Sequence, residues 1–262
     1  MKNLYALLAC LLIGFHGLAQ KKYRTLEGAL LNPTEATELI LNGSQDYKDL
    51  PADIAKLVNL KALKMYGCGI KKLSPNIGQL KNLQVLDLGG NYLQVLPPEI
   101  CNLTKLRELS LQRNEITELP EEMGNMISLE QIDLSNNKLV TLPLSFYMLP
   151  NLFLINLQFN ELTYLSPQVA LLSNLEFLNL SRNKLENIPE KLWFTPKLYN
   201  LNLHKCGAML KLPKDICDIP ASSTKTRVAL IDSWHVPAGI LLPKCSYGND
   251  GTRNGWYINV SE

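Results

Sequence analysis

The sequence lacks most of the side chains and loops that enzyme chemistry requires. It has 3 histidines among 262 residues, and only His204 and His235 lie beyond the first 19. It contains no HExxH, GxSxG or Walker-type motif, the patterns that hold a catalytic zinc, an activated serine or a nucleotide phosphate. We therefore expect no catalytic residues, no metal, no cofactor and no enzyme activity.

A large excess of either charge is also absent. The chain has 26 Lys and Arg against 24 Asp and Glu, a formal net charge of +2 at pH 7. Because nucleic-acid binding depends on a concentrated positive surface, no nucleic-acid partner is expected. The composition does not shift along the chain, which predicts one elongated domain.

A long apolar run is missing too, and the shorter one at the N-terminus has the features of a signal peptide. Lys2 precedes an apolar run from Leu4 to Phe15, and Gly17-Leu18-Ala19 offers the small residues of a signal-peptidase site. We predict that residues 1–19 are a secretory signal peptide. The mature protein is then expected to be secreted, periplasmic or at the cell surface, without membrane insertion.

Two other interpretations of this segment are weaker. A transmembrane anchor needs about 20 apolar residues, and this run is shorter and is followed by Lys21 and Lys22. A lipoprotein signal at Cys10 would leave an apolar region too short to engage the membrane.

What the sequence does have is one unit, repeated. Residues 83–105 read LQVLDLGGNYLQVLPPEICNLTK, with apolar side chains at positions 1, 4, 6, 11, 14, 18 and 21 and Asn91 at position 9. Leu86-Asp87-Leu88 alternates with a period of two, which predicts a strand with one buried face. Ile100 and Leu103 are three apart after a proline pair, which indicates a helical turn. Neither element buries much surface alone, so copies must stack on both sides.

Leucine recurs at position 1 in six steps of 23 residues, at Leu60, Leu83, Leu106, Leu129, Leu152, Leu175 and Leu198. The pattern LxxLxLxxNxLxxLPxxIxxL resembles the leucine-rich repeat in its 23-residue form. This resemblance covers Ala36 to about Ala221, or about eight repeats. It implies an α/β fold, a right-handed curved solenoid with a parallel sheet on its concave face and short helical turns on its convex face. It also implies protein binding. The repeats lack the Gly-x-Ile-Pro of plant extracellular types, which favours a bacterial or Ras-suppressor-like protein.

Two further segments flank the predicted repeats of residues 36–221. An N-terminal cap is expected over 20–35, with a linker from Lys21 to Arg24 and a helix that begins after Thr25. A C-terminal cap is expected over 222–262, where RVALI (227–231) and WYINV (256–260) predict two short strands.

Asparagine fills position 9 of the central repeats, at Asn91, Asn114, Asn137, Asn160 and Asn183. A buried amide there can bond to backbone groups of adjoining turns, so we predict a structural ladder. Cys68 and Cys206 take the same position in the flanking repeats and are expected to be small buried side chains. At position 5, Asp87 and Asp133 lie two repeats apart, about 9.6 Å, on an open face with no pocket to raise either pKa.

The other cysteines predict one disulfide. Cys68 and Cys206 are six repeats apart, roughly 29 Å, and Cys101 and Cys217 are five repeats apart, so neither pair can bridge. In an oxidising compartment we therefore expect a Cys217–Cys245 bond, with Cys206–Cys245 as the alternative.

Large apolar side chains collect near position 3 of repeats five to seven and predict a partner-binding patch on the concave face: Phe153, Leu154, Phe159, Phe177 and Tyr199. A different possibility is that these side chains only pack on each other or on the C-terminal cap. The predicted function is binding of a protein or peptide of unknown identity. The alternatives are inhibition of a secreted or host enzyme, or regulation of a GTPase pathway inside the cell if the signal peptide is not real.

Overall fold

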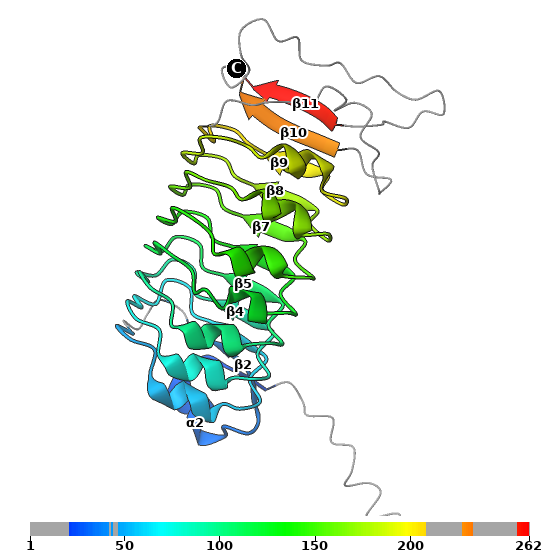
Figure 1. The fold of residues 1–262 in the computed structure, drawn as a ribbon. Helices are drawn as coiled ribbons and strands as arrows, with labels where there is room; N and C mark the ends of the chain where they lie inside the picture. The colour runs from blue at the N-terminus through cyan, green and yellow to red at the C-terminus, as the bar shows by residue number, and fades with distance from the viewer. Residues whose placement is uncertain (1–20, 42, 44–46, 208–226, 233–255, 262) are drawn as a thin grey trace, which may run out of the picture.

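The structure is a computed structural model that describes residues 21–41, 43, 47–207, 227–232 and 256–261. Its described strands form one open sheet in which each strand pairs in parallel with the next along the chain. Figure 1 shows these strands stacked one above another, with short helices on the opposite side of the coil. The predicted solenoid with a parallel sheet is confirmed.

The strands of the sheet are short. They are β1 Lys21–Tyr23, β2 Ala36–Ile40, β3 Ala62–Lys64, β4 Val85–Asp87, β5 Glu108–Ser110, β6 Gln131–Asp133, β7 Leu154–Asn156, β8 Phe177–Asn179, β9 Asn200–Asn202, β10 Arg227–Asp232 and β11 Trp256–Ser261. The two strands expected near the C-terminus are β10 and β11. In β3 to β9 the middle residue is buried and the first residue faces solvent at least in part, as strand alternation requires.

The helical turns of the repeats are 3₁₀ helices. They are η1 Ala52–Lys56, η2 Pro75–Gln79, η3 Pro98–Asn102, η4 Met123–Asn125, η5 Leu144–Met148, η6 Pro167–Leu171 and η7 Glu190–Phe194. Proline at the first position begins three of them, because its fixed φ suits the turn and its missing N–H would have no partner there. Among the described residues no helix is long and apolar enough to cross a membrane.

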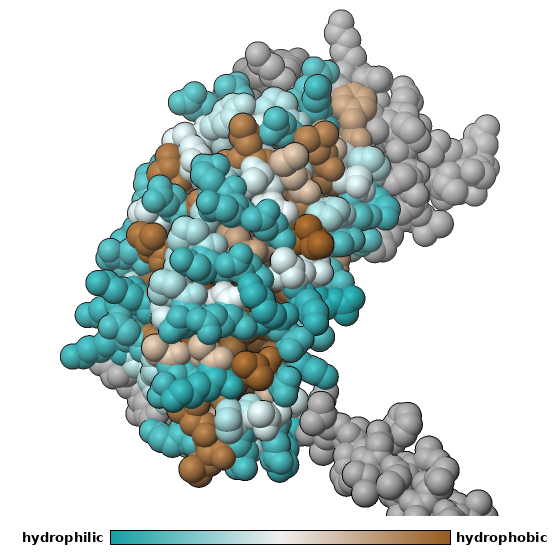
Figure 2. All heavy atoms as spheres, turned by 60° about the horizontal axis from the view of Figure 1, so that its bottom comes forward, coloured by the Kyte–Doolittle hydropathy of each residue, from teal (hydrophilic) through white to brown (hydrophobic). Residues whose placement is uncertain are grey.

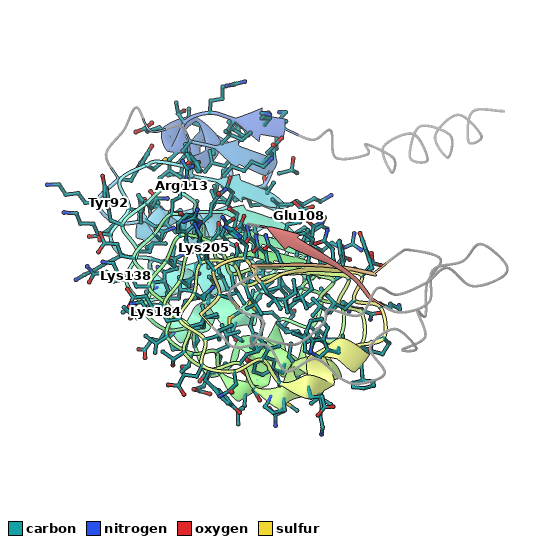
Figure 3. All side chains as sticks on the ribbon, turned by 90° about the horizontal axis from the view of Figure 1, so that it is seen from above. Tyr92, Glu108, Arg113, Lys138, Lys184 and Lys205 are labelled. Atoms are coloured by element: carbon teal, nitrogen blue, oxygen red, sulfur yellow. The ribbon has the colours of Figure 1, made fainter. Side chains whose placement is uncertain are left out.

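One continuous core runs the length of the repeats between sheet and helices. The position-1 leucines, from Leu60 to Leu198, are all fully buried. Outside the core, Figure 2 shows a largely hydrophilic face with small separate groups of hydrophobic residues. Seen from the end of the coil, Tyr92, Lys138 and Lys184 lie along one lateral edge, away from Glu108 of the sheet (Figure 3).

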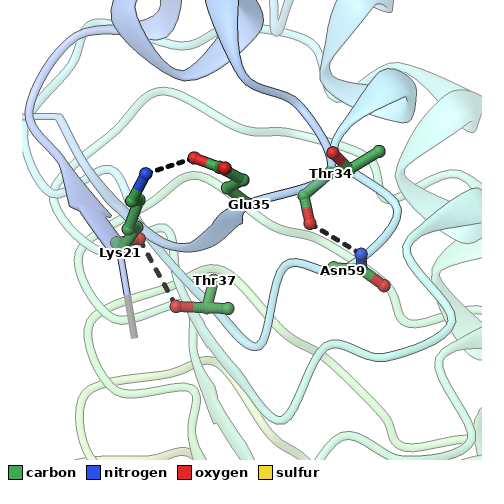
Figure 4. Close-up of polar contacts among 5 residues, drawn as sticks. All are labelled: Lys21, Thr34, Glu35, Thr37 and Asn59. Atoms are coloured by element: carbon green, nitrogen blue, oxygen red, sulfur yellow. Dashed lines mark hydrogen bonds and ion pairs between the residues drawn. The ribbon is translucent and has the colours of Figure 1, made fainter. Parts of the chain in front are cut away.

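The N-terminal segment differs from the prediction. Lys21–Tyr23, expected to be a linker, is strand β1 and pairs in parallel with β2. Figure 4 shows how it is held: Lys21 forms an ion pair with Glu35, and the Thr37 hydroxyl donates to the Lys21 carbonyl at 3.4 Å. The helix that follows is α2, Leu26–Leu31, and the Thr25 hydroxyl accepts from the Gly28 N–H at its start. The sheet is therefore one strand longer than expected at this end.

A left-handed residue follows each strand of the central repeats at position 8. Glycine occupies this position twice, at Gly67 and Gly90. Five other residues there have φ of 52–57°: Arg113, Asn136, Phe159, Arg182 and Lys205. This conformation costs a non-glycine residue roughly 1–2 kcal/mol. At five of these seven positions the next residue is a ladder asparagine, whose bonds to the backbone help to hold the turn, and Gly67 and Lys205 are followed by Cys68 and Cys206.

Each ladder asparagine joins its own repeat to the one before it. The Asn137 Oδ1 accepts from the Ile116 N–H at 3.0 Å, and its Nδ2 donates to the carbonyls of Leu111 and Leu134, both at 3.0 Å. The same three bonds recur, at 2.8–3.1 Å, for Asn91, Asn114, Asn160 and Asn183. At the ladder's N-terminal end the Cys68 thiol donates to the Leu41 carbonyl at 3.4 Å.

Several predictions concern residues outside the described ranges. The signal peptide of residues 1–19 lies there, and so do Cys217 and Cys245 of the expected disulfide. The N- and C-terminal cap boundaries at 20 and 222 also fall on such residues.

Candidate functional site

The concave face is built from the first and third residues of each central strand. Pairing is in register across the sheet, so each position forms a column. The position-3 column reads Glu38, Ala62, Val85, Glu108, Gln131, Leu154, Phe177, Asn200, and the position-5 column reads Ile40, Lys64, Asp87, Ser110, Asp133, Asn156, Asn179, Asn202. The face is therefore polar over most of its area. Its apolar members are Ile40, Ala62 and Val85 on β2 to β4 and the larger Leu154 and Phe177 on β7 and β8.

The adjacent strands β7 and β8 bring two of the predicted binding residues together. Leu154 pairs directly with Phe177 across β7 and β8, and both side chains are half-buried. Adjacent strands lie about 4.8 Å apart, so the two side chains form one surface. Gln131 borders them on one side and Asn200 on the other.

The other three predicted residues lie beyond the ends of the strands. Phe153 and Tyr199 precede β7 and β9, and Phe153 lines a depression of about 260 Å³ with Glu130 and Glu176. Phe159 follows β7 in the left-handed conformation, and the Arg182 guanidinium carbon lies 4.7 Å from its ring centroid, a cation–π contact. The structure therefore brings Leu154 and Phe177 together and places Phe153, Phe159 and Tyr199 outside the strands.

A shallow depression adjoins the apolar pair on the concave face. It has a volume of about 280 Å³, and its polar lining includes Lys64, Asp87, Glu108, Ser110 and Asp133, while Leu154 closes one end. The Asp87 carboxylate accepts from the Gly89 N–H at 3.0 Å, and the Asp133 carboxylate from the Ser135 N–H at 2.9 Å. Each aspartate therefore holds the turn after its strand, and both line the depression. The second oxygen of Asp133 accepts from the Asn156 side-chain amide at 3.3 Å.

The two aspartates of the concave face lie two strands apart. Asp87 and Asp133 are separated by Ser110 in register, the spacing that was expected. Among the described residues, no group of three or more His, Cys, Asp and Glu side chains could hold a metal ion.

A larger depression lies at the lateral edge and was not predicted. Its volume is about 630 Å³, and its lining includes Lys71, Lys72, Tyr92 and Glu115. The Lys138 ammonium donates to Glu115 at 2.9 Å, and this hydrogen bond and charge lower the pKa of the Glu115 carboxyl. These side chains come from positions 10 to 13, where the chain is irregular and no hydrophobic period points to a surface.

Comparisons with known proteins identify the family. A model described as "Leucine-rich repeat region" matches residues 39–110, one described as "Leucine rich repeat" matches 104–162, and a third, "Leucine Rich Repeat", matches 174–194. The chain is a leucine-rich-repeat protein. A search of the curated proteins found no match.

Solved structures of leucine-rich-repeat proteins share the fold. A leucine-rich-repeat protein of Leptospira interrogans is 25% identical, with a TM-score of 0.67 over 82% of this chain and 72% of that one. The ectodomain of the Arabidopsis thaliana receptor kinase GASSHO1/SCHENGEN3 is 28% identical, with a TM-score of 0.62 over 76% of this chain and 24% of that one. An internalin of Listeria monocytogenes, 19% identical with a TM-score of 0.62 over 80% and 65% of the two chains, shows the fold alone.

The size of the match differs among these proteins. The chain spans most of the Leptospira protein but about a quarter of the plant ectodomain. The family and the plant receptor ectodomain place the leucine-rich-repeat chain among protein-interaction modules.

Proposed function

We propose that this leucine-rich-repeat protein is an exported binding protein that holds an extended peptide or protein segment on its concave face, without catalysis. The observation that carries the proposal is the direct pairing of two large apolar side chains, Leu154 and Phe177, on a mostly polar sheet. A few large apolar side chains on a rigid surface carry most of the energy of a typical interface. Single exposed apolar residues need no such explanation, but these two are adjacent, and Leu154 also lines a depression.

Two of the similar structures support a peptide ligand. The GASSHO1/SCHENGEN3 ectodomain was solved in complex with CASPARIAN STRIP INTEGRITY FACTOR 2, and the plant peptide hormone receptor RGFR1, 26% identical, in complex with RGF2. An open sheet of parallel strands offers a continuous surface on which an extended peptide can lie.

Export is supported by where the sheet begins. Strand β1 begins at Lys21, so cleavage after Ala19 would leave every strand of the described sheet intact. Mass spectrometry of the N-terminal peptide tests this directly. A mature chain that still begins at Met1 would contradict export by this route and would revive the interpretation as an intracellular regulator of a GTPase pathway.

The binding proposal is tested by selecting a phage-displayed library of random dodecapeptides on the immobilised protein. For the enriched peptides, Leu154→Ala with Phe177→Ala should weaken binding by more than about 2 kcal/mol, roughly 30-fold. Fluorescence anisotropy with labelled peptides measures the loss, and circular dichroism checks that the variant remains folded.

A matched control removes two apolar side chains from the other face. Met148 and Leu171 end η5 and η6 and are 72% and 63% exposed. The variant Met148→Ala with Leu171→Ala should bind the peptides as the wild type does. Equal binding by the wild type and the folded Leu154/Phe177 variant would refute the proposed site.

A further inference from the structure

Three carboxylates on the concave face are not neutralised by the protein. Asp87, Glu108 and Asp133 lie on the neighbouring strands β4, β5 and β6. Within the described part of the chain, none of the three forms an ion pair. Six other carboxylates do, each with a lysine or arginine: Glu35, Glu38, Asp53, Glu115, Glu130 and Glu161. The three carboxylates therefore leave a local negative charge on the concave sheet.

The three carboxylates surround one depression. Asp87 and Asp133 flank Ser110 in register, about 9.6 Å apart by strand spacing. Glu108 lies on the same face of β5 as Ser110, two residues or about 7 Å along the strand. All three line the concave depression of about 280 Å³. Lys64 lines it too, on β3, so the acidic groups exceed the basic ones by two.

The apolar pair lies at a fixed distance from this acidic centre. Gln131, which is uncharged, separates Glu108 from Leu154 in the position-3 column. The distance from β5 to the midpoint between β7 and β8 is two and a half strand spacings, about 12 Å. An extended segment advances about 3.3 Å per residue and presents alternate side chains to the same face. A separation of four residues spans about 13 Å, and it is the even number of residues that best matches the distance of about 12 Å between the two sites.

We infer that the ligand is an extended segment that carries a lysine or arginine four residues from a large apolar side chain, and that it crosses the strands along the axis of the solenoid. The cation would lie among Asp87, Glu108 and Asp133, and the apolar side chain against Leu154 and Phe177. Opposite charges across an interface select partners and speed their association, so acidic segments would be rejected. This inference rests on the proposed concave-face function.

The test uses the same phage-displayed dodecapeptide library. Enriched peptides should contain Lys or Arg four residues from Phe, Trp, Tyr, Leu or Met, in either order, more often than the unselected library does. A labelled enriched peptide should bind at least tenfold more weakly to the triple variant Asp87→Asn, Glu108→Gln, Asp133→Asn, and more weakly in 500 mM than in 50 mM NaCl. The asparagines retain the oxygen that accepts from Gly89 and Ser135, so the turns are kept.

A charge-matched control separates local from overall electrostatics. Glu118, Glu121 and Glu122 are exposed and lie away from the sheet, and their replacement by glutamine changes the net charge by the same amount. This control variant should bind the peptide as the wild type does.

The outcomes distinguish the inference from the function on which it rests. Peptides that lose binding to the Leu154→Ala, Phe177→Ala variant but keep it with the triple variant would overturn the inference and leave concave-face binding standing. Enriched acidic peptides would do the same. Peptides that bind both variants as they bind the wild type would overturn both.

Discussion

The asparagine ladder makes a quantitative prediction about stability. Asn137 is 8% exposed, and its amide bonds to the Ile116 N–H and to the carbonyls of Leu111 and Leu134. Asn137→Leu keeps the approximate size of the side chain but leaves these three backbone groups without that partner. An unsatisfied buried polar group costs about 1–3 kcal/mol. We expect the free energy of unfolding to fall by about 3 kcal/mol, because local movement relieves part of the cost of leaving three backbone groups unpaired.

Urea denaturation followed by circular dichroism measures this loss. A change of about 3 kcal/mol corresponds to a decrease in Tm of roughly 6–12 °C for a protein of this size. The control is Asn125→Leu at position 20, since Asn125 is exposed and Met148 and Leu171 occupy the same position in later repeats. It should shift the midpoint by less than about 0.5 kcal/mol. Equal midpoints for wild type and Asn137→Leu would refute the role given to the ladder.

Three more predictions concern cysteines and one glycine. Peptide mapping without reduction should recover Cys217 joined to Cys245, and finding both as free thiols would contradict the expected disulfide. Burial, with a smaller contribution from nearby acidic charge, raises the pKa of Cys101 to about 12, so at pH 8.5 almost none of these thiols is ionised. Iodoacetamide should therefore leave Cys101 unmodified in the native protein and label it after unfolding, as mass spectrometry would show; rapid native labelling would argue against its burial. Gly90 has φ +65°, and an added Cβ would lie 3.0 Å from Cζ of the Tyr66 ring, so Gly90→Ala should cost about 1–2 kcal/mol in urea denaturation. Adding Tyr66→Ala to the Gly90→Ala variant should recover only the part of the lost stability that comes from this contact. Complete recovery of the wild-type stability would rule out backbone strain as a cause.

The sequence was sufficient to predict the fold because buried leucines recur with one period. The leucine at position 1 is buried from Leu60 to Leu198, and a core packed this closely fixes the repeat length. The leucine period does not predict strand β1, Lys21–Tyr23. This strand has no apolar alternation, and its pairing with β2 is made by the backbone, so the sequence pattern gave no sign of it.

The candidate site was predictable only in part, and for a physical reason. Leu154 and Phe177 lie within regular strands, where alternation determines which face a side chain occupies. Phe159 lies at position 8, where the backbone is left-handed, and neither periodicity applies. The lateral depression near Lys71 and Tyr92 was missed for the same reason, because its lining comes from irregular loops.

The bonds of the ladder have a consequence for how this protein can change its length. Each asparagine from Asn91 to Asn183 accepts from the residue 21 positions earlier and donates to carbonyls 26 and 3 positions earlier. Removing or duplicating a whole block of 23 residues between them restores every one of these pairs. At the N-terminal end a repeat one residue longer is accommodated, where the Cys68 thiol donates to the Leu41 carbonyl 27 positions earlier. Where the ladder ends, the Leu185 N–H bonds to the carbonyl of Cys206 at 2.8 Å, so that end needs no further asparagine. The extent of the concave surface can therefore vary in whole repeats, each adding or removing one strand, while the two ends stay as they are.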